Sequence, residues 1–189
     1  MKVILASKSP RRKELLSLIL PQFAVCESGA DEMVNGNASP LEKISEISKR
    51  KADAIKGEKG DIIISADTAV VFENRILGKP ENSENAAEML KMLSGKTHKV
   101  ITAFTVKKDE KSVTEAVETE VSFNPLSDAE IENYIKTGEP FDKAGAYGIQ
   151  GYAAKFISKI SGDYFTVVGL PVSALYKTLK EFGLFEKEH

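Results

Sequence analysis

Residues 3–16 have the sequence VILASKSPRRKELL, which predicts a strand that leads directly into a helix. The first four residues are apolar, as is typical of a buried strand. Ser9 and Pro10 indicate a helix start, because a serine hydroxyl accepts a backbone N–H and proline is tolerated at the first helical position. Arg11 and Arg12 follow in the first turn, where the helix dipole disfavours cations. This placement indicates a turn that binds an anion such as a phosphate, with a solvated basic turn as the alternative.

Composition limits the class of protein. The chain has 189 residues, 42% of them hydrophobic, which suffices for one domain with a substantial core. A formal net charge of -2 argues against a protein that coats nucleic acid. The single cysteine, Cys26, excludes an intramolecular disulfide and is expected in the core. No run approaches the roughly 20 apolar residues of a membrane span, so we expect a cytoplasmic protein without a membrane partner.

Hydrophobic periodicity predicts further strands and helices along the rest of the chain. Two capping boxes, at residues 39–42 and 127–130, each start a helix. Apolar patterns predict two further helices, over residues 83–94 and 171–182. They also predict two hairpins, one that pairs residues 99–107 with 113–123 and one that pairs 152–160 with 164–168. Strand–helix units combined with hairpins favour an α/β fold with a mixed sheet.

Two charged residues fall where apolar ones are expected. Lys51 lies on the apolar stripe of the helix that starts at residue 40, so it either extends to the rim or binds an anion in a cleft, which we favour. Asp67 divides the apolar residues 61–72, which we expect to form two strands or one bent strand. A buried carboxylate is costly unless it is paired or metal-bound, although a turn carboxylate is an equally simple explanation.

The connection over residues 138–151 is long and rich in glycine, which is typical of a functional loop. Within it, Gln150 either recognises a ligand or closes its own turn, and Tyr147 is equally compatible with a core position.

Cations and carboxylates near predicted strand and helix ends are the components of phosphoryl chemistry with a hard divalent metal. The cations are Arg11, Arg12, Lys51, Lys79 and Lys143, and the carboxylates are Glu32, Asp67 and Asp142. The sequence has only two histidines, His98 and His189, so neither a Ser-His-Asp triad nor a histidine zinc site is expected.

Five short motifs support a family assignment. They are ASxSPRRxELL at residues 6–16, ADT at 66–68, KP at 79–80, GEPxDKAGAYGIQG at 138–151 and VGLP at 168–171. Together they resemble the Maf family of nucleoside triphosphate pyrophosphatases, and the resemblance covers essentially the whole chain.

The resemblance implies an elongated α/β fold, with a twisted mixed sheet flanked by helices and two lobes around a central cleft, similar to the inosine triphosphate pyrophosphatases. It implies a single Maf-like domain over residues 1–189 and a house-cleaning hydrolase that converts a nucleoside triphosphate to the monophosphate and pyrophosphate. It further implies a divalent metal cation, which would be Mg²⁺, Mn²⁺ or Co²⁺. Family members are commonly dimers, so a homodimer is expected.

The resemblance also assigns roles by position. It implies that Asp67 is the proton acceptor that activates water, and that Glu32 and Asp67 lie at the metal. The phosphate-handling positions are Ser7, Arg12, Lys51 and Lys79. The positions associated with substrate choice are Arg11, Thr68 and Gln150.

Gln150 points to the branch of the family that acts on dTTP and UTP. An amide offers both a donor and an acceptor, which matches the O4 and N3–H edge of uracil or thymine. In the 7-methyl-GTP branch a glutamate tends to replace this glutamine. We therefore expect turnover of dTTP and UTP, including modified pyrimidine triphosphates. The alternatives are a pyrophosphatase for 7-methyl-GTP or other modified purines, and a nucleotide-binding regulator of septum formation.

Overall fold

The computed structural model describes residues 1–34 and 37–185, and the chain divides into two compact units. The first unit contains Met1–Asp67, Thr102–Val117 and the chain from Gly169 onward. The second unit contains Thr68–Ile101 and Glu118–Val168.

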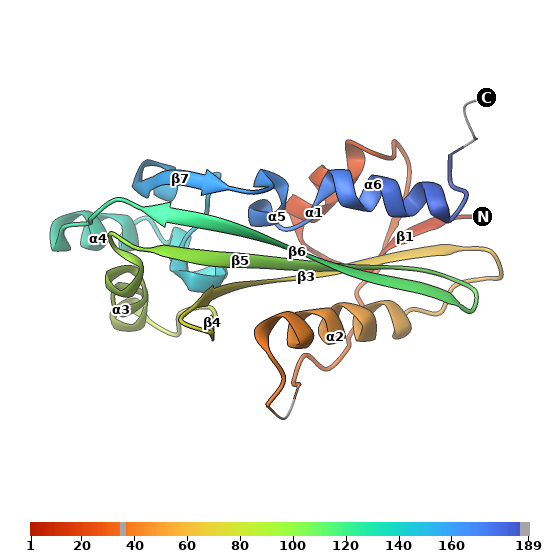
Figure 1. Cartoon of the computed structure of the whole chain (residues 1–189), viewed down its shortest axis with the longest axis horizontal. Helices are drawn as coiled ribbons and strands as arrows, with labels where there is room; N and C mark the ends of the chain where they lie inside the picture. Colours follow the sequence, from red (N-terminus) through yellow and green to blue (C-terminus); the bar gives the residue numbers. More distant parts are fainter. Residues whose placement is uncertain (35–36, 186–189) are drawn as a thin grey trace. The chain divides into compact units, whose positions relative to one another are not determined.

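The described residues form a seven-stranded mixed sheet with the strand order β2-β1-β3-β5-β6-β7, and β4 pairs with β3 (Figure 1). The strands are β1 Val3–Leu5, β2 Ala24–Val25, β3 Ile62–Phe72, β4 Arg75–Leu77, β5 Thr97–Lys108, β6 Lys111–Phe123 and β7 Ile157–Ser161. β1 is parallel to both β2 and β3, whereas β4 is antiparallel to β3 and β7 is antiparallel to β6. The predicted mixed sheet and the β5–β6 hairpin are therefore confirmed.

Of the α-helices in the described residues, all but the one over residues 164–168 begin at or next to a predicted position. The helices are α1 Pro10–Ser17, α2 Pro40–Asp53, α3 Ser83–Leu93, α4 Asp128–Ile135, α5 Tyr164–Val168 and α6 Val172–Glu181. Three short 3-10 helices are η1 Glu139–Asp142, η2 Ala144–Ala146 and η3 Tyr152–Phe156. None of the helices in residues 1–34 and 37–185 combines the length and the hydrophobicity that a membrane span requires.

In the first unit, local hydrogen bonds fix the starts of α1 and α2, the helices that carry Arg12 and Lys51. The Ser9 side chain accepts from the backbone N–H of Arg12 at the start of α1. Ser39 and Glu42 form a reciprocal capping box at the start of α2. Figure 1 shows α2 on one side of the strands and α1 and α6 on the other. The sheet in this unit is thus covered by helices on both faces.

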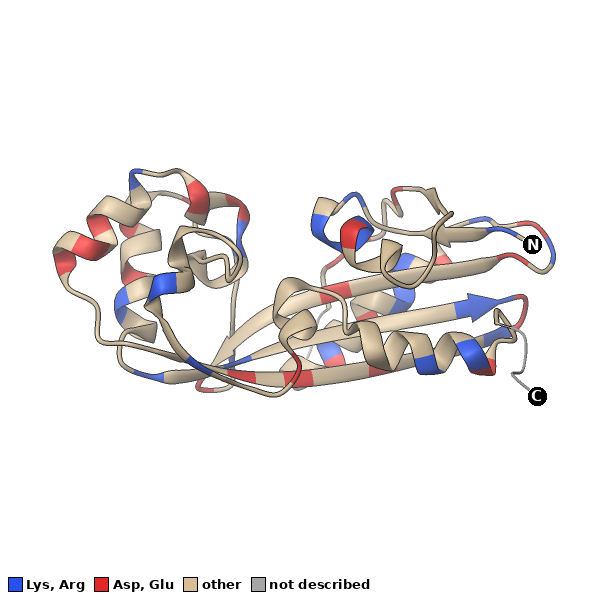
Figure 2. Cartoon of the chain, turned by 90° about the horizontal axis from the view of Figure 1, so that it is seen from above, with Lys and Arg blue, Asp and Glu red and all other residues tan. Residues whose placement is uncertain are grey.

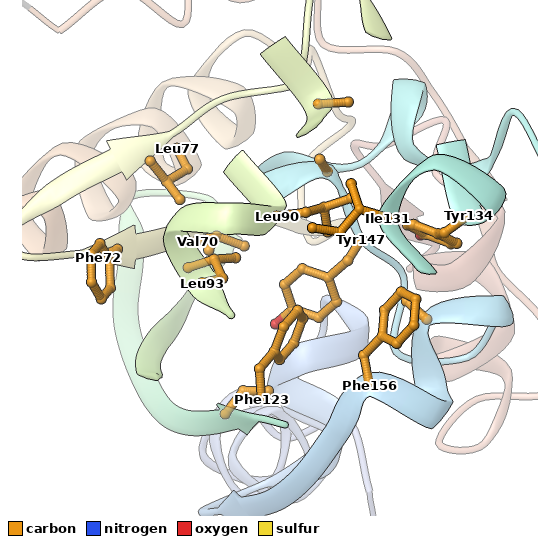
Figure 3. Packing of buried hydrophobic residues seen from close by; sticks show 14 of the residues in the cluster. Val70, Phe72, Leu77, Leu90, Leu93, Phe123, Ile131, Tyr134, Tyr147 and Phe156 are labelled. Carbon is orange, nitrogen blue, oxygen red and sulfur yellow. The ribbon is translucent and has the colours of Figure 1, made fainter. Parts of the chain in front are cut away.

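The core of the second unit is built around Tyr147, whose ring is almost completely buried. Figure 3 shows Tyr147 among side chains from several elements, with Phe123 beside it. The Phe123 and Tyr147 rings meet edge to face, with centroids 4.9 Å apart. The core interpretation of Tyr147 is therefore the correct one, and the 138–151 loop is anchored in this core through its side chain.

Three expectations from the sequence are wrong. β3 is a single uninterrupted strand, because Asp67 pairs with a lysine and does not force a break. The predicted hairpin of residues 152–160 with 164–168 does not form: residues 152–156 are η3, and β7 pairs with β6. Residues 164–168 form α5 rather than a strand, because the Asp163 carboxylate accepts from Thr166 N at 3.0 Å and so caps a helix. Cys26 is exposed, since β2 has only two residues, both of them exposed.

Candidate active site

Lys51 and Asp67 come together from different elements of the first unit. Lys51 lies in the last turn of α2, and Asp67 lies within β3. Lys51 Nζ is 2.6 Å from Asp67 Oδ1 and 2.7 Å from Glu32 Oε1. The lysine is only 8% exposed, so its charge depends on these carboxylates for compensation. The inward lysine predicted from the helical stripe is thus part of a cluster with two predicted carboxylates.

Buried hydroxyl groups hold α2 against the strands at this point. Ser48 lies one turn before Lys51. Its Oγ is 2.9 Å from Thr105 Oγ1 and 3.3 Å from Ser65 Oγ. Ser65 Oγ also donates to the Ser48 carbonyl at 2.6 Å. Because all three hydroxyl residues are fully buried, these bonds fix the register of α2 and β3 and hence the distance between Lys51 and Asp67.

Arg12 extends from the first turn of α1 and is held by two oxygen atoms. Its Nε donates to the Gly169 carbonyl at 3.0 Å, and its Nη1 donates to Ser7 Oγ at 3.3 Å. Burial lowers the pKa of the Arg12 guanidinium, and the negative charge of Asp67 acts in the opposite direction. Figure 2 shows basic residues gathered on α1, whose sequence is PRRKELLS. This turn is therefore a pre-organised cationic site beside the loop that carries Ser7.

Two more predicted residues are neighbours of this cluster along the chain. Arg11 precedes Arg12 in the first turn of α1 and is half-buried. Thr68 follows Asp67 in β3, is also half-buried and is the first residue of the second unit.

Lys79 and Gln150 belong to the second unit, and both are exposed. Lys79 follows β4, and the Gly145 N–H donates to the carbonyl of the preceding Gly78 at 3.0 Å. The turn that carries Lys79 is therefore hydrogen-bonded to the loop that carries Gln150.

The residues that would hold a metal can be tested against the donor chemistry. In residues 1–34 and 37–185, no group of three or more His, Cys, Asp or Glu side chains is arranged as a metal cage. Glu32 and Asp67 nevertheless bring carboxylate oxygens to one point, where both meet Lys51 Nζ. Mg²⁺ commonly binds one or two protein carboxylates and takes its other ligands from substrate phosphates and water. The two carboxylates fit that pattern.

Sequence reasoning missed three residues that shape these sites. Ser48 and Ser65 hold α2 against β3 through their hydrogen bonds. The position of Ser48 on the apolar stripe of its helix was the sequence feature that could have indicated its role. Glu139 accepts hydrogen bonds from the backbone N–H groups of Tyr152 and Ala153, just after Gln150, and its place in the GEP segment was the available signal.

The chain is an α/β protein in which a nearly buried lysine meets two carboxylates, and solved structures share its fold. The Ham1 protein of Staphylococcus aureus is 14% identical, with a TM-score of 0.52 and coverage of 96% of this chain and 99% of that one. A HAM1 protein from Coxiella burnetii is 12% identical, with a TM-score of 0.50 and the same coverage. The predicted fold class is confirmed.

The family model described as Maf-like protein matches residues 2–182. This chain belongs to that family. It is 47% identical over 184 residues to a dTTP/UTP pyrophosphatase of Bacillus cereus, covering 97% of this chain and 96% of the relative. It is also 47% identical over 184 residues to a dTTP/UTP pyrophosphatase of Bacillus velezensis, covering 97% of both chains. The family resemblance found from the motifs is confirmed.

Proposed function

We propose that this protein is a nucleoside triphosphate pyrophosphatase that hydrolyses dTTP and UTP to the monophosphate and pyrophosphate. Its nearly full-length similarity to relatives that bear this name supports the assignment. The GIQG sequence at residues 148–151 supports the pyrimidine specificity, because the Gln150 amide supplies one donor and one acceptor.

The observation that carries the proposal is the contact of one buried lysine with two carboxylates. Asp67 accepts a proton from the attacking water as the anhydride bond between the α and β phosphates breaks. Lys51 holds the Asp67 carboxylate in place, since its Nζ is 2.6 Å from Oδ1. When substrate arrives, the same ammonium group stabilises negative charge on the phosphates.

Glu32 and Asp67 are the residues that would hold a divalent cation such as Mg²⁺, Mn²⁺ or Co²⁺. When bound there, such a cation would supply charge neutralisation for the phosphates and a lower pKa for the attacking water.

The remaining residues bind and orient the substrate. The Arg12 guanidinium and the Ser7 hydroxyl, already hydrogen-bonded to each other, bind phosphate oxygens of the leaving pyrophosphate. Lys79 contributes a further positive charge to the phosphates. Arg11, Thr68 and Gln150 select the nucleoside.

The test is a substrate panel with the wild-type protein and Asp67→Asn. Each protein is incubated with Mg²⁺ or Mn²⁺ and one of dTTP, UTP, CTP, GTP, ITP or 7-methyl-GTP, and pyrophosphate and monophosphate are quantified. We expect selective turnover of dTTP and UTP by the wild type and none by Asp67→Asn. The matched control is Asp53→Asn, which removes the carboxylate of an exposed pair with Lys107 in the same unit and should retain turnover.

Other outcomes select the alternatives. Turnover confined to 7-methyl-GTP would leave the chemistry in place and overturn the pyrimidine assignment. Tight nucleotide binding without release of pyrophosphate would favour a regulator of septum formation. Wild-type turnover by Asp67→Asn would remove Asp67 from the mechanism.

The assignment also includes a single functional domain over residues 1–189, a homodimer, a cytoplasmic location and no nucleic-acid partner. Sedimentation of the purified protein tests the dimer. Retention on immobilised DNA or RNA at physiological salt would contradict the last proposal.

A further inference from the structure

The carboxylate of Glu139 connects three segments of the second unit. Glu139 begins η1, directly after Gly138. Its Oε2 accepts from the backbone N–H of Tyr152 at 2.8 Å. Its Oε1 accepts from Tyr134 Oη at 2.8 Å and from the N–H of Ala153 at 3.4 Å. The residues that follow Gln150 are thus fixed to α4 through one side chain.

The same carboxylate packs against both ends of the turn that carries Gln150. A Cβ atom added to Gly151 would lie 2.1 Å from Glu139 Oε2. A Cβ atom added to Gly148 would lie 3.3 Å from Glu139 Oε1 and 2.9 Å from Lys143 Cε. The turn is closed by the Gly151 N–H, which donates to the Gly148 carbonyl at 3.1 Å. Glycine at both positions lets the backbone approach Glu139 closely.

Tyr134 holds Glu139 from the other side. Its side chain is 1% exposed and packs edge to face against Phe156. Burial raises the pKa of the Tyr134 hydroxyl, and the hydrogen bond to Glu139 raises it further. Tyr134 therefore remains a hydrogen-bond donor at neutral pH, and the carboxylate has little freedom to turn.

Gln150 and the following Gly151 are exposed, whereas Gly148 at the start of the turn is buried. An exposed amide discriminates between bases only if its backbone is held in one conformation, because a mobile amide also meets the donor and acceptor pattern of other bases.

We propose that Glu139 is a positioning residue for base selection: by binding the 148–153 backbone, it presents the Gln150 amide in the orientation that matches the O4 and N3–H edge of a pyrimidine. This inference rests on the proposed function and names a residue that acts on specificity through Gln150. Glu139 makes no contact with the reacting phosphates in this proposal.

The test is Glu139→Gln, which preserves the size of the side chain but has one acceptor oxygen. In the wild type, the Tyr134 hydroxyl and the backbone N–H groups of Tyr152 and Ala153 donate to two oxygens. We expect KM for dTTP and UTP to rise about tenfold, with kcat changed by less than about threefold, since the Lys51–Asp67 pair is untouched. The ratio of kcat/KM for dTTP to that for CTP should fall at least about fivefold. Amide hydrogen exchange at Tyr152 and Ala153 should accelerate.

The matched control is Glu130→Gln, which also removes a carboxylate that accepts from backbone in this unit. Glu130 Oε2 accepts from Ser127 N at 2.8 Å and caps α4. This variant should lose stability but keep the wild-type dTTP to CTP ratio. An equal loss of the ratio in both variants would mean a merely structural role for Glu139 and would overturn the inference.

A second variant covers the case in which Glu139→Gln does not fold. Tyr134→Phe removes the hydroxyl that orients the carboxylate and also bonds to the Gly148 backbone, and its dTTP to CTP ratio should fall in the same direction. An unchanged ratio in the folded variants overturns the inference alone. Absence of dTTP and UTP turnover in the wild type overturns the proposed function, and the inference with it.

Discussion

Lys51 Nζ lies 2.6 Å from Asp67 Oδ1, and this contact joins the last turn of α2 to β3. The two side chains are 10% and 15% exposed, so each charge is poorly hydrated and depends on the other. Glu32, which also meets the ammonium, is 65% exposed and can be hydrated without it. Of the two carboxylates, Asp67 therefore depends more on Lys51 for the compensation of its charge and for its position.

Removal of the Lys51 charge should affect stability as well as turnover. We expect Lys51→Met to abolish turnover and lower the free energy of unfolding by about 3 kcal/mol, because Asp67 is left as an uncompensated buried charge. Urea denaturation of Lys51→Met, Asp67→Asn and the double variant measures the coupling, expected at about 1–3 kcal/mol. Additive effects of the two single variants would show that the pair is not coupled.

Arg12 should not be replaceable by lysine. Its guanidinium donates to both the Gly169 carbonyl and the Ser7 hydroxyl, a geometry that a lysine ammonium cannot reproduce. We expect Arg12→Lys to raise KM for dTTP about tenfold or more, as measured by pyrophosphate release. Arg75→Lys, at an exposed position in β4, serves as the control and should leave KM unchanged. Equal KM values for the two variants would contradict the role of the guanidinium fork.

Ser48 should contribute to both stability and catalysis. We expect Ser48→Ala to lower the free energy of unfolding by about 1–3 kcal/mol, because it removes a buried hydroxyl that bonds to Thr105 and Ser65. Turnover should fall as well, since Lys51 lies one turn further along α2. Ser158→Ala, which removes an exposed hydroxyl that donates to the Ser122 carbonyl, is the control for both measurements. Full turnover in Ser48→Ala would show that the hydroxyl network is not needed to position Lys51 for catalysis.

His98 should make the protein less stable in mild acid. Burial lowers the pKa of the imidazole from 6.5 to about 4, and its ring lies against Phe123 and Tyr147. Between these two pH values the unfolded chain binds the proton and the folded chain does not. The free energy of unfolding should therefore decrease as the pH falls from 6.5 towards 4, by up to about 1.4 kcal/mol per pH unit.

Urea denaturation between pH 7 and pH 5 measures this slope. Above pH 5 most carboxylates are ionised in both states, so the histidine dominates the difference. His98→Asn should have a flatter profile than the wild type. Parallel profiles for the two proteins would contradict the effect of burial.

Gly145 should tolerate alanine less well than Gly138. Both have positive φ angles, 69° and 77°. A Cβ at Gly145 would lie 2.9 Å from Val70 Cγ1, whereas nothing lies within 4 Å of one at Gly138. We expect Gly138→Ala to cost about 1 kcal/mol for the left-handed backbone, and Gly145→Ala about 3 kcal/mol because of the added overlap. Thermal unfolding of the two variants measures the difference, and equal costs would contradict the close approach of Val70.

The sequence predicted the elements whose signals are local. Ser9, Ser39 and Ser127 each start a helix where predicted, because a side chain and the backbone within four residues supply the hydrogen bonds. The apolar stripe of α2 likewise placed Lys51 on the inward face correctly.

One error overlooked a local helix cap, and another came from an interaction between distant residues. Residues 164–168 have the β-branched and aromatic composition of a strand, but the Asp163 carboxylate starts α5. β3 continues through Asp67 because a lysine from α2 compensates the carboxylate, and no pattern within residues 61–72 contains that lysine.

Motifs and periodicity were sufficient to identify the family, the α/β class and the residue types available for phosphate chemistry. The folded structure was needed to show that Lys51 meets both Asp67 and Glu32, that Arg12 is held by Ser7 and Gly169, and that Glu139 accepts from the backbone that follows Gln150. Apart from the Arg12–Ser7 hydrogen bond, these contacts join residues that are at least 13 positions apart in the chain. Their distances depend on the packing of whole elements, which local sequence patterns do not specify.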